Sequence, residues 1–165
     1  MTAFRDLVAA TLPSEERLRA RLADLSARDW ANLAMVFAAG LPEFDAVVAL
    51  PGASELAREL ARARGVPVLD PERTDDVAQA VPPGGEVVLV TAHLTGGEAE
   101  GTAAAAVTGR GLRTVAVATA VERTSAGGRQ RLEGQGLRLY TALQLADTPG
   151  GLVFERRAPT RWRLG

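Results

Sequence analysis

The residues best suited to binding a ligand form a short segment between an apolar run and an alanine-rich stretch. The run covers residues 87–90, and the segment after it contains Thr95, Gly96, Gly97, Glu98 and Ala99. Small residues at the start of a helix let the backbone approach an anion closely, and the N–H groups there point outward at the positive end of the helix dipole. The segment predicts a loop that cradles a phosphate. Taken alone, a plain strand-to-helix turn is an equal alternative.

Few other side chains near this loop could do chemistry. His93 could donate a hydrogen bond to a phosphate or act as an acid or base. No carboxylate or nucleophile has a defined relation to it, so a structural role is favoured. Thr91 and Thr95 could present hydroxyl groups to a ligand, and for Thr91 the favoured interpretation is a strand-end residue that bonds its own backbone. The chain has no cysteine, which removes thiolate metal sites and cysteine nucleophiles.

The elements that position this loop belong to an alternating pattern. From Phe44 onward, short runs rich in β-branched residues alternate with helical stretches, which is typical of a parallel sheet. The expected strands are 46–50, 66–69, 87–90, 114–121 and 138–140, and the expected helices are 54–64, 98–108 and roughly 125–135. Glycines in the last helix allow it to be only a turn. We therefore predict the α/β class, with a five-stranded, mainly parallel sheet flanked by helices.

A helical portion precedes the sheet. Apolar residues recur at three- and four-residue spacing over residues 3–38, and two short helices fit this pattern better than one. Ser14 can cap a helix start. Ser26, with Asp29 three residues later, predicts a capping box for a second helix that runs to about Gly40.

Length and composition describe one domain. A chain of 165 residues can bury a core without disulfides or a structural metal. Its net charge is −1, so any site for an anion must be local. No apolar run approaches the roughly 18–20 residues that span a bilayer, and residues 1–12 lack the order of a secretory signal, so we expect a cytoplasmic protein with no membrane partner. Within the single domain, 1–165, we expect a helical portion (1–42), a core (43–147) and a hairpin tail (148–165).

The order of these segments resembles the orotate branch of the type I phosphoribosyltransferases over roughly residues 44–147. The likeness rests on the segments 44–52, 87–99, 113–118, 121–123 and 127–129. It implies that Thr95, Gly96 and Gly97 match the family's loop for the 5′-phosphate of phosphoribosyl pyrophosphate, and that Pro51 and Gly52 match its pyrophosphate loop. It also implies a homodimer, with magnesium as a cofactor only if the chain is catalytically active.

Several positions depart from the family's pattern. Val90 and Thr91 replace the acidic pair that grips the ribose hydroxyls, so no charge-assisted hydrogen bond to a diol forms there. Glu98 replaces a hydroxyl residue beside the phosphate, and its carboxylate repels a phosphate at close range. Residues 70–86 are too few for the family's mobile covering loop, whose lysines this chain lacks. We therefore expect no catalytic residue, no metal site and no cofactor.

The tail from Gly151 to Gly165 places arginines around Trp162 and could contact nucleic acid through phosphate pairing and base stacking. Its basic footprint is small in a slightly acidic chain, so a docking or dimer-forming hairpin is favoured. The sequence thus predicts a non-catalytic phosphoribosyltransferase-like protein, kept as a binding or regulatory module with a small phosphorylated ligand. The alternatives are an active phosphoribosyltransferase of nucleotide metabolism with an atypical site, and a nucleic-acid binder that uses the tail.

Overall fold

The computed structural model describes residues 2–70 and 81–155 of the 165-residue chain. The strands in this part are β1 (Ala46–Ala49), β2 (Val68–Leu69), β3 (Glu86–Leu94), β4 (Arg113–Arg123), β5 (Leu139–Thr148) and β6 (Gly151–Phe154). They form one sheet in the order β2-β1-β3-β4-β5-β6, in which only β5 and β6 pair antiparallel. The predicted α/β class with a mainly parallel sheet is confirmed.

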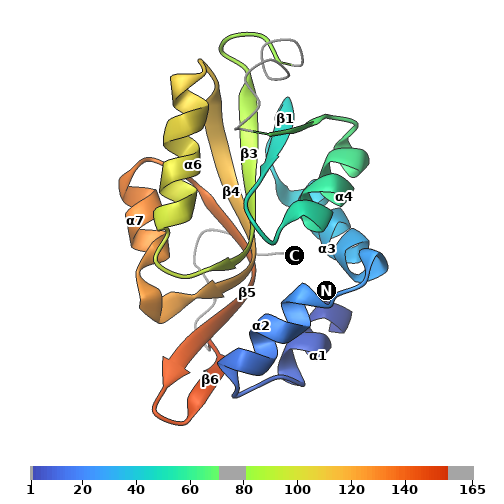
Figure 1. The fold of residues 1–165 in the computed structure, drawn as a ribbon, viewed down its shortest axis with the longest axis vertical. Helices are drawn as coiled ribbons and strands as arrows, with labels where there is room; N and C mark the ends of the chain where they lie inside the picture. The colour runs from blue at the N-terminus through green and yellow to red at the C-terminus, as the bar shows by residue number, and fades with distance from the viewer. Residues whose placement is uncertain (1, 71–80, 156–165) are drawn as a thin grey trace.

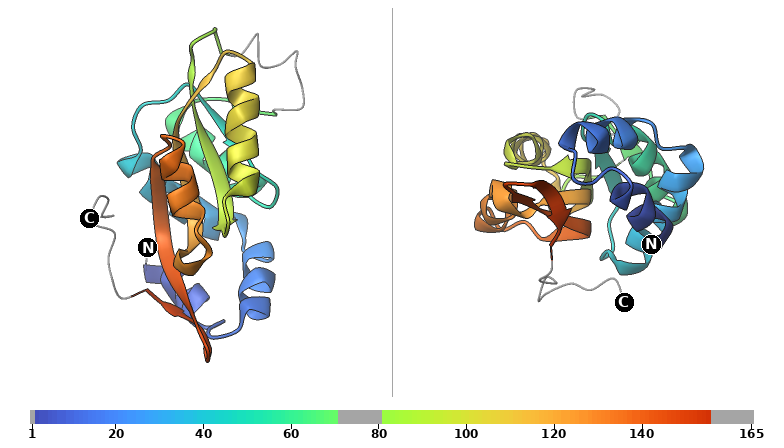
Figure 2. Two further views of the ribbon diagram at one scale, coloured as in Figure 1. Left: turned by 90° about the vertical axis from the view of Figure 1, so that its left-hand side faces the viewer. Right: turned by 90° about the horizontal axis from the view of Figure 1, so that it is seen from below.

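Helices cover both faces of this sheet, giving three layers (Figures 1 and 2). The helices on one face are α1 (Thr2–Ala9), α2 (Glu15–Ala23), α3 (Ala27–Gly40) and α4 (Ser54–Arg64), and those on the other are α6 (Glu98–Gly109) and α7 (Gly128–Gly134). A short 3-10 turn, Thr124–Ala126, precedes α7, so the weakly predicted third helix is a turn followed by a helix. Within the described ranges, no helix has the length and apolar character needed to cross a membrane.

The N-terminal portion contains three helices, so the prediction of two is wrong in number. The break falls before Pro13, because a proline disfavours helical backbone in the residue that precedes it. Ser14 then caps α2 by accepting a hydrogen bond from the backbone N–H of Arg17 at 3.1 Å. The capping box predicted at the start of α3 is confirmed, with both hydrogen bonds between Ser26 and Asp29 at 3.1 Å.

Strand β3 extends four residues beyond the predicted end at Val90. This extension pairs with β4, where Leu94 lies opposite Glu122, and β4 pairs in turn with β5, where Glu122 lies opposite Gln144. A strand continues while its neighbours satisfy its backbone N–H and C=O groups. As a result, Val90 and Thr91 lie inside the strand instead of at its end.

The sheet has one strand more than the five predicted. β5 continues to Thr148, well past the predicted end at Tyr140, and a tight turn returns the chain as β6. Antiparallel strands can be joined by such a short turn, and Leu145 and Leu152 add buried apolar surface on this hairpin. This hairpin between β5 and β6 is not the one predicted for the tail, which would pair residues 152–157 with the segment around Trp162. The arginine-rich residues 156–165 lie outside the described residues.

Helices α1 and α2 are fastened to the ends of β4, β5 and β6 by charged side chains. Arg123 at the end of β4 forms ion pairs with Glu15 of α2, at 3.1 Å, and with Asp147 of β5. The guanidinium of Arg5 lies 3.8 Å from the centroid of the Phe154 ring. Figure 1 shows α1 and α2 beside β5 and β6 at the lower end of the molecule.

A row of threonines crosses the buried face of the sheet that α6 and α7 cover. Thr91, Thr119 and Thr141 lie opposite one another on β3, β4 and β5, and none is more than 5% exposed. Thr91 bonds the carboxyl group of Glu100 on α6, and Thr141 donates to the carboxylate of Glu122 at 2.8 Å. Because a buried polar group is costly without a hydrogen bond, the contact between Thr91 and Glu100 helps to fix how α6 lies on the sheet.

Glu100 is a buried acid on this interface. It is 4% exposed, and burial, assisted by the nearby charge of Glu98, raises the pKa of its carboxyl group above the ordinary value. The folded chain therefore binds this proton more tightly than the unfolded chain does. The stability that the protonated carboxyl contributes is complete below the unfolded pKa of about 4.3 and is lost as pH rises through the folded pKa.

We expect Glu100→Gln to leave stability nearly unchanged below about pH 4 and to stabilise the folded chain increasingly at higher pH. Urea unfolding from about pH 3.5 to about pH 8 measures the difference in free energy of unfolding between variant and wild type. Glu16→Gln, at an exposed position of α2, is the matched control and should show no such trend. A difference at Glu100 that stays constant with pH would contradict the assignment of a raised pKa.

Candidate functional site

The loop predicted to hold a phosphate lies between β3 and α6, at the carboxyl edge of the sheet. Gly97, the residue before α6, has a φ of 83°, a left-handed conformation that glycine adopts without strain. A Cβ on Gly97 would lie 3.2 Å from the carbonyl oxygen of Gly128, and a Cβ on Gly128 would clash with the carbonyl oxygen of Thr95. Glycine at both positions therefore lets the loop pack directly against the start of α7.

Glu98 covers the open side of this loop. A Cβ built on Gly96 would lie 2.5 and 2.6 Å from the two carboxylate oxygens of Glu98, so the side chain folds back over the glycine. Arg131 of α7 approaches the same carboxylate, with Nη2 3.4 Å from Oε1. The Glu98 side chain is 69% exposed, so solvent screens this ion pair. A carboxylate thus lies at the loop where an anionic ligand was predicted.

The two positions that match the family's acidic pair are buried inside the protein. Val90 has no exposed surface and belongs to the apolar core under α1 to α4. Thr91 is 5% exposed, and its hydroxyl bonds Glu100 under α6. The strand-end role favoured for Thr91 from sequence is wrong, because the extended pairing of β3 places it within the sheet.

The structure separates the two predicted ligand loops. Pro51 and Gly52 form an exposed turn after β1, and the backbone N–H of Leu50 bonds the carbonyl of Val90 at 2.9 Å. The phosphate loop begins only after Leu94. The β3–β4 ladder therefore runs past the end of β1, and the two loops leave the sheet at different levels along β3.

His93 lies at the end of β3, opposite Val121. Burial, followed by the charge of Arg123, lowers the pKa of His93 to about 4, so its imidazole is neutral at neutral pH and supplies no positive charge to an anion. Its Nε2 atom is buried and has no hydrogen-bond partner within the described part of the chain. No group of three or more metal-ligating side chains occurs among residues 2–70 and 81–155.

A polar network around Glu122, beside the loop, was not predicted from the sequence. Glu122 at the end of β4 is 1% exposed and accepts hydrogen bonds from Arg129 at 2.7 and 2.9 Å, from Thr141 at 2.8 Å and from Gln144 at 3.1 Å. These bonds hold the start of α7 against β4 and β5, and so position Arg131. One sequence signal could have revealed this network, namely a glutamate inside an otherwise apolar strand pattern.

Comparison with known proteins places this arrangement among solved structures. No family model and no curated protein matches the sequence. The orotate phosphoribosyltransferase of Mycobacterium tuberculosis H37Rv, solved with inorganic phosphate, superposes with a TM-score of 0.65 at 22% identity, covering 86% of this chain and 94% of that one. A phosphoribosyltransferase from Corynebacterium diphtheriae gives 0.63 at 22% identity, covering 88% and 97%.

A third structure, the orotate phosphoribosyltransferase of Aeropyrum pernix, gives a TM-score of 0.63 at 15% identity, covering 86% of this chain and 93% of that one. Sequence identities this low carry the likeness in fold and leave the activity open. The resemblance drawn from the order of segments is confirmed at this level. The chain has the fold of the type I phosphoribosyltransferases.

Proposed function

We propose that this chain is a non-catalytic phosphoribosyltransferase-like protein that serves as a binding or regulatory module for a small phosphorylated ligand. The observation that carries the proposal is the burial of Val90 and Thr91 within the sheet. A transferase of this fold needs acidic groups there to hold the ribose. A carboxylate placed at either position would be enclosed by the core, where an unpaired charge is strongly destabilising.

A magnesium ion does not fit these positions either. Magnesium in proteins is bound by carboxylate oxygens together with phosphates of the substrate, and neither valine nor threonine supplies a carboxylate.

Phosphate binding at the β3–α6 loop is the part of the family's chemistry that the chain retains. Thr95, Gly96 and Gly97 keep the loop small, and α6 is a 12-residue helix whose positive dipole end lies there. The orotate enzyme of Mycobacterium tuberculosis has been solved with phosphate and with phosphoribosyl pyrophosphate. These structures show that the same fold accommodates phosphorylated ligands in that enzyme.

Glu98 limits this binding in the wild-type chain. Its carboxylate folds over Gly96, so a phosphate must approach a like charge or displace it. At 4 Å each pair of unit charges repels by about 1 kcal/mol in bulk water, and by more near a protein surface. Arg131 partly offsets this repulsion, and it would be free to contact a phosphate if Glu98 were absent.

The purified chain should show no transfer of a phosphoribosyl group to orotate, adenine, guanine, hypoxanthine or uracil with magnesium present, because the acidic pair is missing. Release of pyrophosphate from phosphoribosyl pyrophosphate measures this. Turnover above the background, if it disappears in a Thr95→Val or Glu98→Gln variant, would show an active enzyme with an atypical site.

Replacing Glu98 with threonine should raise the affinity for inorganic phosphate and lower stability slightly. The affinity gain comes from removing a like charge, and the stability loss of about 0.3–1 kcal/mol comes from removing an acidic side chain at a helix N-terminus. Calorimetric titration measures the first effect and urea unfolding the second. Glu16→Thr makes the same substitution in the first turn of α2 and should leave phosphate affinity unchanged.

A double variant separates the role of Arg131 from the removal of charge. If Arg131 becomes a phosphate ligand once Glu98 is gone, Glu98→Thr with Arg131→Gln should lose most of the affinity that Glu98→Thr gains. Equal phosphate affinity in the wild type and in Glu98→Thr would contradict the idea that Glu98 covers a phosphate loop.

A further inference from the structure

A groove runs between α6 and residues 135–138, the segment that joins α7 to β5, and is also lined by the first residues of β4. Its volume is about 570 Å³, within the range of small-molecule sites. Small residues leave this space open, because α6 presents Gly101, Ala104, Ala105 and Thr108 to it at helical spacing. Gln135 closes one end, since a Cβ on Gly101 would lie 3.3 Å from its side-chain amide.

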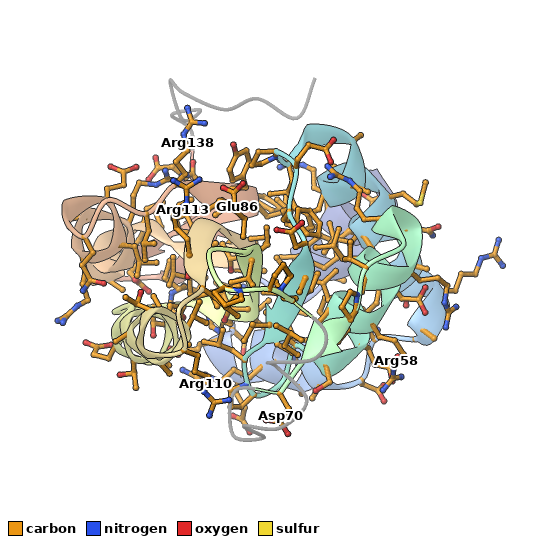
Figure 3. The ribbon with its side chains drawn as sticks, turned by 90° about the horizontal axis from the view of Figure 1, so that it is seen from above. Arg58, Asp70, Glu86, Arg110, Arg113 and Arg138 are labelled. Carbon is orange, nitrogen blue, oxygen red and sulfur yellow. The ribbon has the colours of Figure 1, made fainter. Side chains whose placement is uncertain are left out.

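Two arginines line the groove where the amino ends of β4 and β5 lie. They are Arg113 at the start of β4 and Arg138 just before β5. Arg138 is exposed and forms no ion pair or side-chain hydrogen bond with the described residues. Arg113 pairs with Glu86 and is 71% exposed. Figure 3 shows Arg113 beside Glu86, and Arg138 on the same side of the molecule as these two residues.

The hydroxyl group of Thr114 is a further polar group beside the groove. The Oγ1 atom of Thr114 is buried, and no protein atom among the described residues bonds it. Because buried hydroxyl groups in folded proteins are almost always hydrogen-bonded, this atom is an unsatisfied polar group beside the arginines.

The charge of the groove selects the kind of ligand. No aspartate or glutamate of the described residues lines it, and Glu86 neutralises only one of the two arginines. Guanidinium groups bind phosphate and carboxylate through paired N–H donors. The alanine face of α6 offers a flat, uncharged wall for the rest of the ligand.

We propose that this groove binds a small organic dianion, a phosphate monoester or a dicarboxylate, whose charged group contacts Arg138 and Arg113 and whose body lies along α6. The groove is separate from the loop at residues 95–99, so the proposal does not depend on the proposed function.

Calorimetric titration with phenyl phosphate, phthalate and inorganic phosphate tests the site. We expect phenyl phosphate or phthalate to bind, and to bind more tightly than inorganic phosphate because the ring contacts the wall. Tighter binding of phenyl phosphate would assign a phosphate monoester, and tighter binding of phthalate a dicarboxylate. Arg138→Gln should weaken that affinity about tenfold, since it removes an unpaired charge-assisted donor. Arg113→Gln should weaken it less, because Glu86 already occupies that arginine.

Arg58→Gln is the matched control. Arg58 is an exposed arginine of α4 paired with Glu55, and Figure 3 shows it on the other side of the molecule from Arg138. It should leave binding unchanged, whereas Ala105→Leu, which fills the groove at an exposed helical position, should abolish the advantage of phenyl phosphate over inorganic phosphate. Binding that is lost in Thr95→Val and kept in Arg138→Gln, or no binding of either organic dianion, would overturn the proposal.

Discussion

The parallel pairing of β3 with β4 beyond the end of β1 determines where the loop at residues 95–99 leaves the sheet. β1 ends opposite Val90, but the β3–β4 ladder continues to Leu94 and Glu122. Thr91 lies just beyond the end of β1 and is buried, and the phosphate loop begins only after Leu94. Within the fold of the type I phosphoribosyltransferases, this pairing therefore sets where the loop leaves the sheet.

The extended pairing places the carboxylate of Glu122 inside the molecule, where it needs hydrogen-bond partners. At its end, Glu122 is buried with four hydrogen bonds, and removing one partner of such a buried pair typically costs 3–5 kcal/mol. Arg129 supplies two of these bonds from the start of α7, which packs on the phosphate loop through Gly128. The hydrogen bonds to the Glu122 carboxylate therefore also position the loop where Glu98 and Arg131 meet.

Much of this architecture could be predicted from local signals. The capping box at Ser26 and Asp29 and the helix that stops at Gly65 depend on neighbouring residues, and both were predicted correctly. The length of β3 could not be predicted, because it depends on partners in β4 and β5 that lie far away in the sequence. The small segment at residues 95–99 was recognised, yet its separation from Pro51 and Gly52 follows from that same non-local pairing.

Side-chain placement was the least predictable feature. Opposition between Glu98 and a phosphate was predicted, but its partner Arg131 was not, because the two residues lie on different helices. The lowered pKa of His93 could not be predicted either, because it depends on burial and on Arg123, which lies on the neighbouring strand β4. The groove beside α6 has no sequence signature, since it arises where small residues on one helix face a sheet edge that carries arginines.

We propose that the chain recognises a phosphate without recognising a ribose. Calorimetric titration of the wild type with inorganic phosphate, ribose 5-phosphate and phosphoribosyl pyrophosphate, each with and without magnesium, is the decisive measurement. We expect ribose 5-phosphate and phosphoribosyl pyrophosphate to bind no more than a few-fold more tightly than phosphate, and magnesium to leave these affinities unchanged. Binding of phosphoribosyl pyrophosphate that is a hundredfold or so tighter than that of phosphate, and dependent on magnesium, would contradict it.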